Sequence, residues 1–210
     1  MLASALITLA AYGALQATIA PPRAYPSGPA EPAQTTPTAP PSDTAWTLGT
    51  LEIGALSGWG KGTVFDPART PTSIAQVIGR VAVHLGPTGT GWLRGNVSFA
   101  VEGVGAWIDQ DPSASGAGLN LLFRYTWDAD RWRPMFLGGA GVLYTNEQVP
   151  PGETTRNFSS QAGLGLQYLI RAHIAIGGEY RFHHLSNKGA TETNPGINTH
   201  LMLFGVSWYR

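Results

Sequence analysis

The residues best suited to chemistry gather in one short stretch near the C-terminus. From Arg181 to Asn198 the chain reads RFHHLSNKGATETNPGIN, with two histidines, a serine and several asparagines between apolar stretches. His184 and Ser186 are two residues apart, and on a β-strand such residues stand side by side on one face. An imidazole in that position can take the serine proton and create a nucleophile. The spacing therefore favours acyl or ester chemistry, provided that the segment is a strand.

The elements that must position these residues are predicted by a period of two. Between Trp46 and Tyr209, apolar residues alternate with small, polar or charged ones, as where Leu121 and Phe123 oppose Asn120. Side chains on a strand point to opposite faces in turn, so each such run indicates a strand with one apolar face. An even number of strands permits a closed barrel. We count eight, at about 46–57, 75–86, 92–107, 117–127, 132–145, 156–168, 172–186 and 197–209.

Strand length and loop pattern favour a barrel in a membrane. Most of the segments exceed the five or six residues typical of soluble strands, and they reach the roughly 9 to 11 residues that cross a bilayer. Long loops (58–74, 108–116, 146–155, 187–196) alternate with short turns (87–91, 128–131, 169–171), as in outer-membrane barrels. Aromatic residues near the strand ends fit the two interfacial girdles; they are Trp46, Trp92, Trp107, Trp127, Trp132, Tyr144, Tyr168, Trp208 and Tyr209.

The alternatives to this all-β, eight-stranded antiparallel outer-membrane β-barrel are a soluble lipocalin-type barrel and a sandwich. Both bury their apolar faces and need a well-charged exterior. Only 12% of the residues here are charged, against roughly 25% in a typical soluble domain. The composition therefore favours the membrane barrel.

Two segments precede the predicted barrel of residues 46–210. Residues 1–20 are apolar and resemble a secretory signal peptide, although no Lys or Arg precedes the apolar run; cleavage could follow Ala20 or Ala17. A retained membrane anchor is the alternative. Residues 21–45 hold 8 of the 16 prolines and few large apolar side chains, so we expect a disordered spacer.

Composition also excludes several functions. The 13 basic and 13 acidic residues balance and are scattered, which argues against nucleic-acid binding. The chain has no cysteine, and therefore no thiolate metal site or cysteine nucleophile. We predict no metal and no cofactor.

The alternation predicts which way the C-terminal residues point. In the segment AHIAIGGEYRFHHLS the even positions are apolar, and continuing that series puts His184 and Ser186 on the lipid-facing side near the external loop. His183 should point into the barrel, in an ordinary hydrogen-bonded role near Arg181. If the hairpin pairs symmetrically about its loop, Asn198 lies opposite His184, close enough for side-chain contact. Polar residues that face lipid are by default candidates for a functional site.

These residues resemble a known family. HLSNKG followed by NPGIN is similar to the signature of the PagL-like lipid A 3-O-deacylases, which are eight-stranded outer-membrane barrels of bacteria that remove an ester-linked acyl chain from the lipid A of lipopolysaccharide. The resemblance covers about Trp46 to the end and is most specific between residues 184 and 198. It implies lipid A as substrate, the bacterial outer membrane as location, and these site residues: His184 as general base, Ser186 as nucleophile, and Asn187 and Asn194 shaping the oxyanion site.

The sequence departs from the family at the third catalytic position. The best-known members carry a glutamate where this chain has Asn198. An amide oxygen can orient a histidine, but it stabilises an imidazolium less than a carboxylate does. Glu192, in the loop, is an alternative acid. The competing functions are a non-enzymatic structural or adhesion barrel, an inactive member of the family, and a narrow pore.

Overall fold

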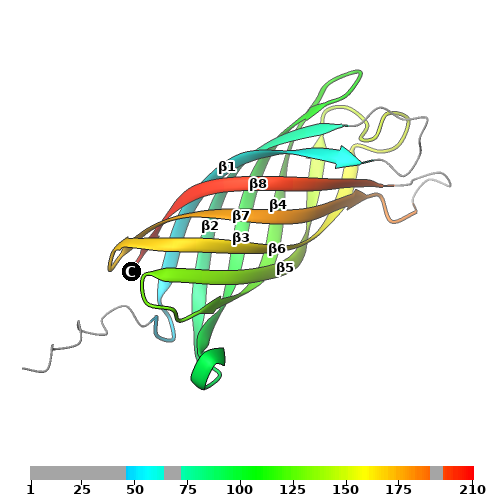
Figure 1. Ribbon diagram of the computed structural model, residues 1–210. Coiled ribbons are helices and arrows are strands. Elements are labelled where there is room, and N and C mark those ends of the chain that lie inside the picture. Colours follow the sequence, from blue (N-terminus) through cyan, green and yellow to red (C-terminus); the bar gives the residue numbers. More distant parts are fainter. Residues whose placement is uncertain (1–45, 64–71, 190–195) are drawn as a thin grey trace, which may run out of the picture. The chain divides into compact units, whose positions relative to one another are not determined.

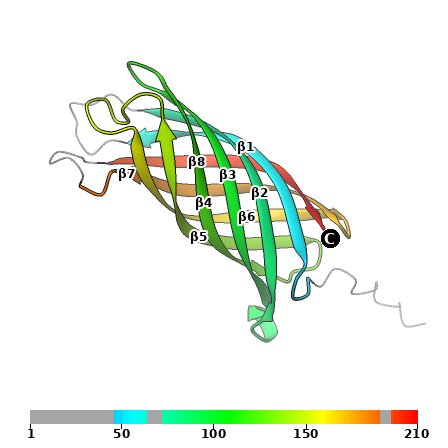
Figure 2. The same cartoon turned by 180° about the vertical axis from the view of Figure 1, so that it is seen from behind.

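The computed structural model describes residues 46–63, 72–189 and 196–210. The predicted signal peptide (1–20) and spacer (21–45) lie outside these ranges. The described residues form a closed barrel in which each strand pairs antiparallel with the next and β8 returns to β1 (Figures 1 and 2). No helix in these ranges is long and apolar enough to cross a membrane. The strands are β1 (Leu51–Thr63), β2 (Ser73–Thr88), β3 (Gly95–Asp109), β4 (Ala114–Trp127), β5 (Trp132–Thr145), β6 (Arg156–Arg171), β7 (Ile174–Ser186) and β8 (Ile197–Tyr209), with a short 3-10 turn, η1 (Gly91–Leu93), between β2 and β3.

The predicted fold is confirmed, and seven of the predicted segments overlap their strands closely. The prediction for the first segment was wrong at both ends, because β1 begins at Leu51 and continues to Thr63. Its outer half carries inward-facing glycines that give no apolar signal. A Cβ at Gly58 would lie 1.9 Å from the Met202 carbonyl oxygen on β8, so the close approach of these two backbones requires a residue without a side chain.

The two faces of the barrel wall differ as a membrane barrel requires. Large apolar side chains are exposed on the outside; they include Val81, Leu119, Phe123, Leu164 and Phe204. Arginine, glutamate and amide side chains are buried inside. A soluble barrel would have the reverse arrangement, since its outer surface faces water.

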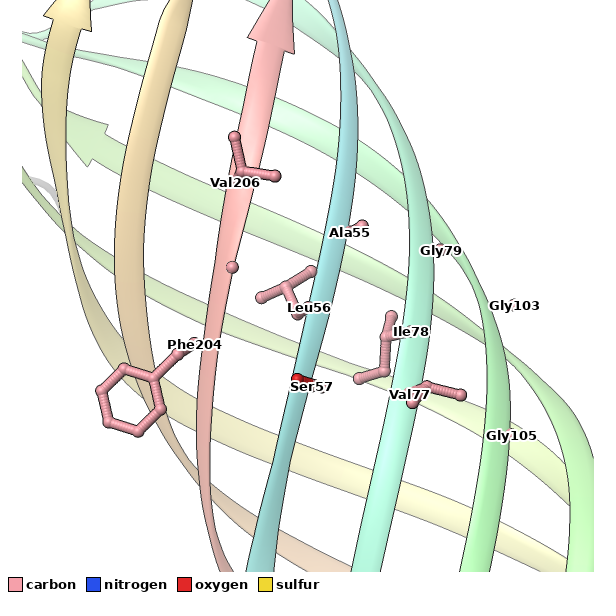
Figure 3. Close-up of a pocket in the computed structure, with 11 residues that line it drawn as sticks. Ala55, Leu56, Ser57, Val77, Ile78, Gly79, Gly103, Gly105, Phe204 and Val206 are labelled. Atoms are coloured by element: carbon pink, nitrogen blue, oxygen red, sulfur yellow. The ribbon is translucent and has the colours of Figure 1, made fainter.

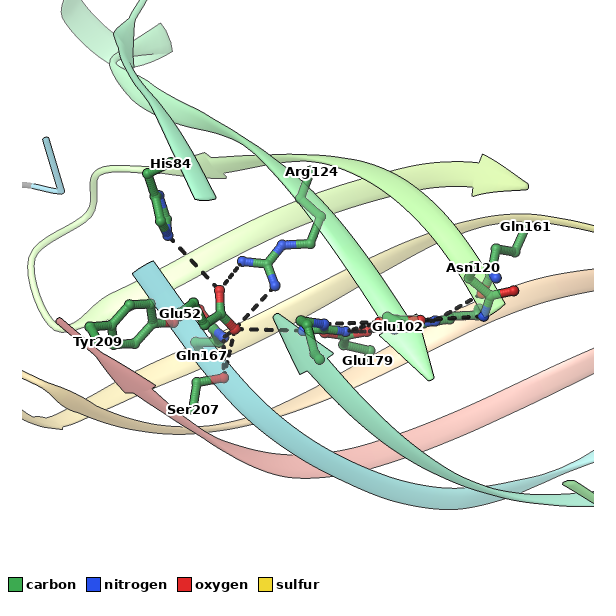
Figure 4. A network of polar contacts seen from close by, with 12 residues as sticks. Glu52, His84, Glu102, Asn120, Arg124, Gln161, Gln167, Glu179, Ser207 and Tyr209 are labelled. Carbon is green, nitrogen blue, oxygen red and sulfur yellow. Dashed lines mark hydrogen bonds and ion pairs between the residues drawn. The ribbon is translucent and has the colours of Figure 1, made fainter. Parts of the chain in front are cut away.

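A network of ion pairs fills the middle of the interior (Figure 4). Glu102 binds Arg80 at 2.7 Å and Arg181 at 2.8 Å. Glu179 binds the same two arginines, at 2.8 Å and 2.6 Å. Glu52 contributes the third carboxylate, which binds Arg124 at 2.5 Å. Three carboxylates thus face three guanidinium groups, and the network is neutral.

Apolar clusters close the interior at both ends. The cluster at the β5–β6 loop end contains Leu185, Ile197 and, from that loop, Val149. At the other end Trp46 stacks on Tyr209, with ring centroids 4.7 Å apart. Placing Trp46 and Tyr209 in the aromatic girdles was therefore wrong, because both rings are buried in the barrel mouth.

Other girdle residues do face outward; Trp92, Trp107, Trp132, Tyr144 and Trp208 are all exposed. The barrel interior, in contrast, contains charged side chains along its middle and apolar side chains at its ends. This filling argues against the narrow pore, because eight strands enclose little more than their own side chains.

The ion network predicts a stability effect. Replacing Glu102 by Gln removes a carboxylate shared by two buried arginines, and breaking such a pair costs about 3–5 kcal/mol. We expect the free energy of unfolding in urea, followed by tryptophan fluorescence in lipid vesicles, to fall by that amount. Glu147→Gln is the matched control because Glu147 is exposed. Equal stability of the two variants would contradict the structural role of the network.

Candidate active site

The β7–β8 hairpin brings His184 and Asn198 together. The two residues are direct partners across the strands, as the symmetrical register predicted. His184 Nδ1 lies 2.7 Å from Asn198 Oδ1. Because the amide oxygen only accepts hydrogen bonds, Nδ1 carries the proton in this contact and Nε2 of a neutral imidazole is left as an acceptor. This is the tautomer that a general base needs.

Residues on the inner face hold this pair in place. Leu185 and Ile197, neighbours of His184 and Asn198 in the chain, are buried in the same apolar cluster as Val149. Alternation then directs His184 and Asn198 to the outer face, in series with the exposed Phe182 and Met202. The predicted lipid-facing orientation of His184 is thus what the structure has.

Ser186 is the last residue of β7 and is half-buried on the same face as His184. It pairs with Phe158 on β6, while His184 pairs with Ser160. Within the described residues no hydrogen bond joins Ser186 to His184, so the two side chains are adjacent but not engaged.

Gly196 packs directly against the imidazole. It has a φ of +66°, and a Cβ built on it would lie 2.6 Å from His184 Cε1 and 3.2 Å from Nε2. The glycine of the NPGIN motif is therefore required both by its backbone conformation and by the space that the imidazole occupies. The NPGIN motif contains Gly196, but only the structure shows that it packs against the His184 imidazole.

Of the two predicted oxyanion residues, Asn187 and Asn194, the structure describes only Asn187. Asn187, the residue after β7, is buried; its Oδ1 accepts from the Gly189 N–H (3.0 Å) and its Nδ2 donates to Glu153 (3.4 Å). The Asn187 side chain thus holds the turn after Ser186 in place. Asn194 and the alternative acid Glu192 lie outside the described residues.

His183 points into the barrel, as predicted, and is buried. Its Nδ1 has no hydrogen-bond partner among the described residues, which differs from the hydrogen-bonded role that we expected. Its nearest neighbours across the strands are Gln161 and Thr199. The two adjacent histidines therefore lie on opposite sides of the wall.

A shallow groove crosses the outer wall over β8, β1, β2 and β3 (Figure 3). Small residues such as Ala55, Gly79 and Gly103 line it, and Ser57 is its one hydroxyl. None of its lining residues is a histidine or an acid, so acid–base chemistry must lie elsewhere. Among the described residues, no group of three or more histidine or acidic side chains could hold a metal ion.

Comparison with known proteins identifies the family. Residues 78–207 match the model of the lipid A 3-O-deacylase (PagL) family. The chain belongs to this family. No curated protein sequence matched the chain.

Solved structures agree on the fold. The barrel is similar to the outer membrane enzyme PagL, with a TM-score of 0.55 and 16% identity over 73% of this chain and 97% of that one. It is also similar to Neisserial surface protein A, with a TM-score of 0.54 and 12% identity over 76% and 98%. At these identities the likeness establishes the fold alone. With the family and the exposed apolar wall, it makes this deacylase-family member an outer-membrane protein.

The packing of Gly196 generates a prediction. Gly196→Ala should displace the imidazole and lower ester hydrolysis at least about 100-fold, as misplacements of about 1 Å do, while the barrel still folds. Gly91→Ala is the matched control, because Gly91, between β2 and β3, also has a positive φ (+58°) but nothing within 4 Å of a built Cβ. Hydrolysis rates on a short soluble ester, with heat-modified gel mobility as the folding check, test this. Equal loss in both variants would assign the effect to backbone strain instead.

Proposed function

We propose that this protein hydrolyses the ester-linked acyl chain at the 3-O position of lipid A, with Ser186 as nucleophile and His184 as general base. The observation that carries the proposal is the His184–Asn198 hydrogen bond on the outer wall, with Ser186 two residues away on the same face. Membership of the deacylase family supports the substrate and the bond cleaved. A structural barrel would have no need of polar groups at this lipid-facing position.

The first half of the reaction uses the free Nε2 of His184. It takes the Ser186 proton as the oxygen attacks the ester carbonyl, and it then gives that proton to the departing sugar oxygen, which leaves as a hydroxyl group. The acyl chain remains on the serine. In the second half, water attacks the acyl-enzyme with His184 again as base, and the fatty acid leaves.

The negative charge on the tetrahedral oxygen needs nearby donors. The backbone N–H of Asn187 follows the nucleophile directly in the chain, and the Asn187–Glu153 and Asn187–Gly189 contacts hold this turn. We infer that Asn187 acts mainly by shaping the turn, since its side-chain oxygen and nitrogen bind Gly189 and Glu153. Asn194 stays the predicted side-chain donor.

The location of the site suits a substrate that lies in the membrane. Lipid A sits in the outer leaflet, with its acyl chains along the barrel wall and its sugars at the surface. The site is at the extracellular end of β7 and β8, where an ester between sugar and chain would lie. The substrate can therefore reach Ser186 sideways from the lipid without entering the barrel.

The reaction can be tested on intact outer membranes. We expect lipid A from bacteria that carry the folded protein to lose the mass of one hydroxyacyl chain in mass spectrometry. Ser186→Ala and His184→Ala should each restore the full mass, because loss of either partner slows such sites by about 10⁴-fold or more.

Matched controls are Ser57→Ala, a serine of the outer groove, and His173→Ala, an exposed histidine between β6 and β7. Both should leave the shortened lipid A unchanged. An unmodified lipid A spectrum with folded wild-type protein would overturn the enzymatic proposal in favour of a structural barrel or an inactive family member.

Asn198, the third residue of the proposed catalytic group, gives a separate prediction. Asn198→Asp keeps the shape of the side chain and places a carboxylate on His184 Nδ1. A hydrogen bond to a charged partner is worth about 1.5–3 kcal/mol against about 1 kcal/mol for a neutral one. We expect kcat to rise about tenfold, and to fall about tenfold in Asn198→Ala. Steady-state rates on detergent-dispersed lipid A measure both; unchanged rates would remove Asn198 from the mechanism.

A further inference from the structure

Positively charged side chains lie on both sides of the proposed catalytic residues. On the β6 side, the Lys188 ammonium lies 4.2 Å above the centre of the Phe158 ring. Phe158 is the strand partner of Ser186 and faces outward, 42% exposed. The cation–π contact therefore holds one positive charge beside the nucleophile.

The second group lies on the other side, across β8. Lys61, near the outer end of β1, is the strand partner of His200, and both side chains are exposed on the outer wall. The Tyr180 hydroxyl lies 2.6 Å from His200 Nδ1. When this hydroxyl donates, the proton of the neutral imidazole is on Nε2. An ammonium and an imidazole N–H are then available side by side.

No acid in the described residues neutralises Lys61. Asp109 lies in the same row, two strands away through Ser73, and makes no ion pair with it. A charged or polar group presented to the membrane without a partner is costly, so its presence calls for a ligand of opposite charge. A lysine at the membrane surface can also contact the headgroups of any surrounding lipid. Competition between lipids distinguishes this contact from binding of one specific anionic ligand.

The spacing of the two groups fits a substrate with two anionic ends. Phe158 on β6 and Lys61 on β1 are three strand intervals apart, about 14 Å, with Ser186 and His184 between them. Lipid A is a disaccharide that carries a phosphate at each end and its ester-linked chains between. We propose that Lys188 on Phe158 and Lys61 with His200 are two phosphate-binding positions that hold these phosphates on either side of the scissile ester.

This proposal rests on the proposed function for the identity of the substrate. Its test measures binding separately from turnover. The non-hydrolysing Ser186→Ala protein, in maltoside micelles free of phosphate, is titrated with lipid A that carries both phosphates, either one, or none. Each lysine is then replaced by methionine in this background. Arg171→Met, which removes an exposed cation at the opposite end of β6, is the matched control.

We expect each lysine variant to weaken binding of the doubly phosphorylated form about tenfold, as for loss of one charge-assisted hydrogen bond. Lys61→Met should have no effect on the form that lacks one phosphate, and Lys188→Met none on the form that lacks the other. Arg171→Met should change nothing. Inorganic phosphate should compete with the doubly phosphorylated form.

Three results would overturn the proposal. Equal losses with all four forms would show that the lysines act on folding or micelle contact. Competition by phosphatidylglycerol as strong as by lipid A would make both positions general headgroup contacts. Affinity independent of phosphate would exclude both phosphate-binding positions.

A different result would reject the proposed function alone. If the wild type hydrolyses no form of lipid A but still binds it in a phosphate-dependent way, the deacylase activity is rejected and the two phosphate-binding positions remain supported.

Discussion

The structure depends on the two-residue alternation of side chains around a closed ring of eight strands. In such a ring a slip of one residue in any strand would turn its charged face towards lipid and its apolar face inward. The interior fixes the correct register, because Glu52, Glu102 and Glu179 must each meet an arginine on a strand that is distant in sequence. A slipped strand would leave buried charges without partners, which is far more costly than the loss of a few apolar contacts.

The geometry of the candidate site follows from the same alternation of side chains. Because Leu185 and Ile197 are anchored inside, His184 and Asn198 must face outward at the same height, where their side chains meet. Gly196 then closes against the imidazole, since no other residue fits that backbone and that space. The polar pair is thus held by an apolar cluster on the other side of the wall.

The sequence predicted the strands, the faces and the His184–Asn198 pairing because each follows from periodicity and hairpin symmetry. It did not predict that Trp46 and Tyr209 are inside, since aromatic residues at strand ends suit a girdle and a plugged mouth equally. The outer half of β1 was missed because glycines carry no apolar signal. The Asn187–Glu153 contact joins residues from two separate loops, and no local pattern records it.

The asparagine at position 198 balances two requirements of a lipid-facing site. Asn198 is only 4% exposed, and on the outer wall the surrounding medium is hydrocarbon or headgroup. A carboxylate there costs desolvation free energy in the resting enzyme, whereas an amide costs much less. In the mechanism that we propose, a carboxylate would recover this cost only when the imidazolium forms, during the chemical step. An amide therefore favours a stable resting barrel with the proton on His184 Nδ1, and in the mechanism that we propose it gives up part of the stabilisation of the transition state.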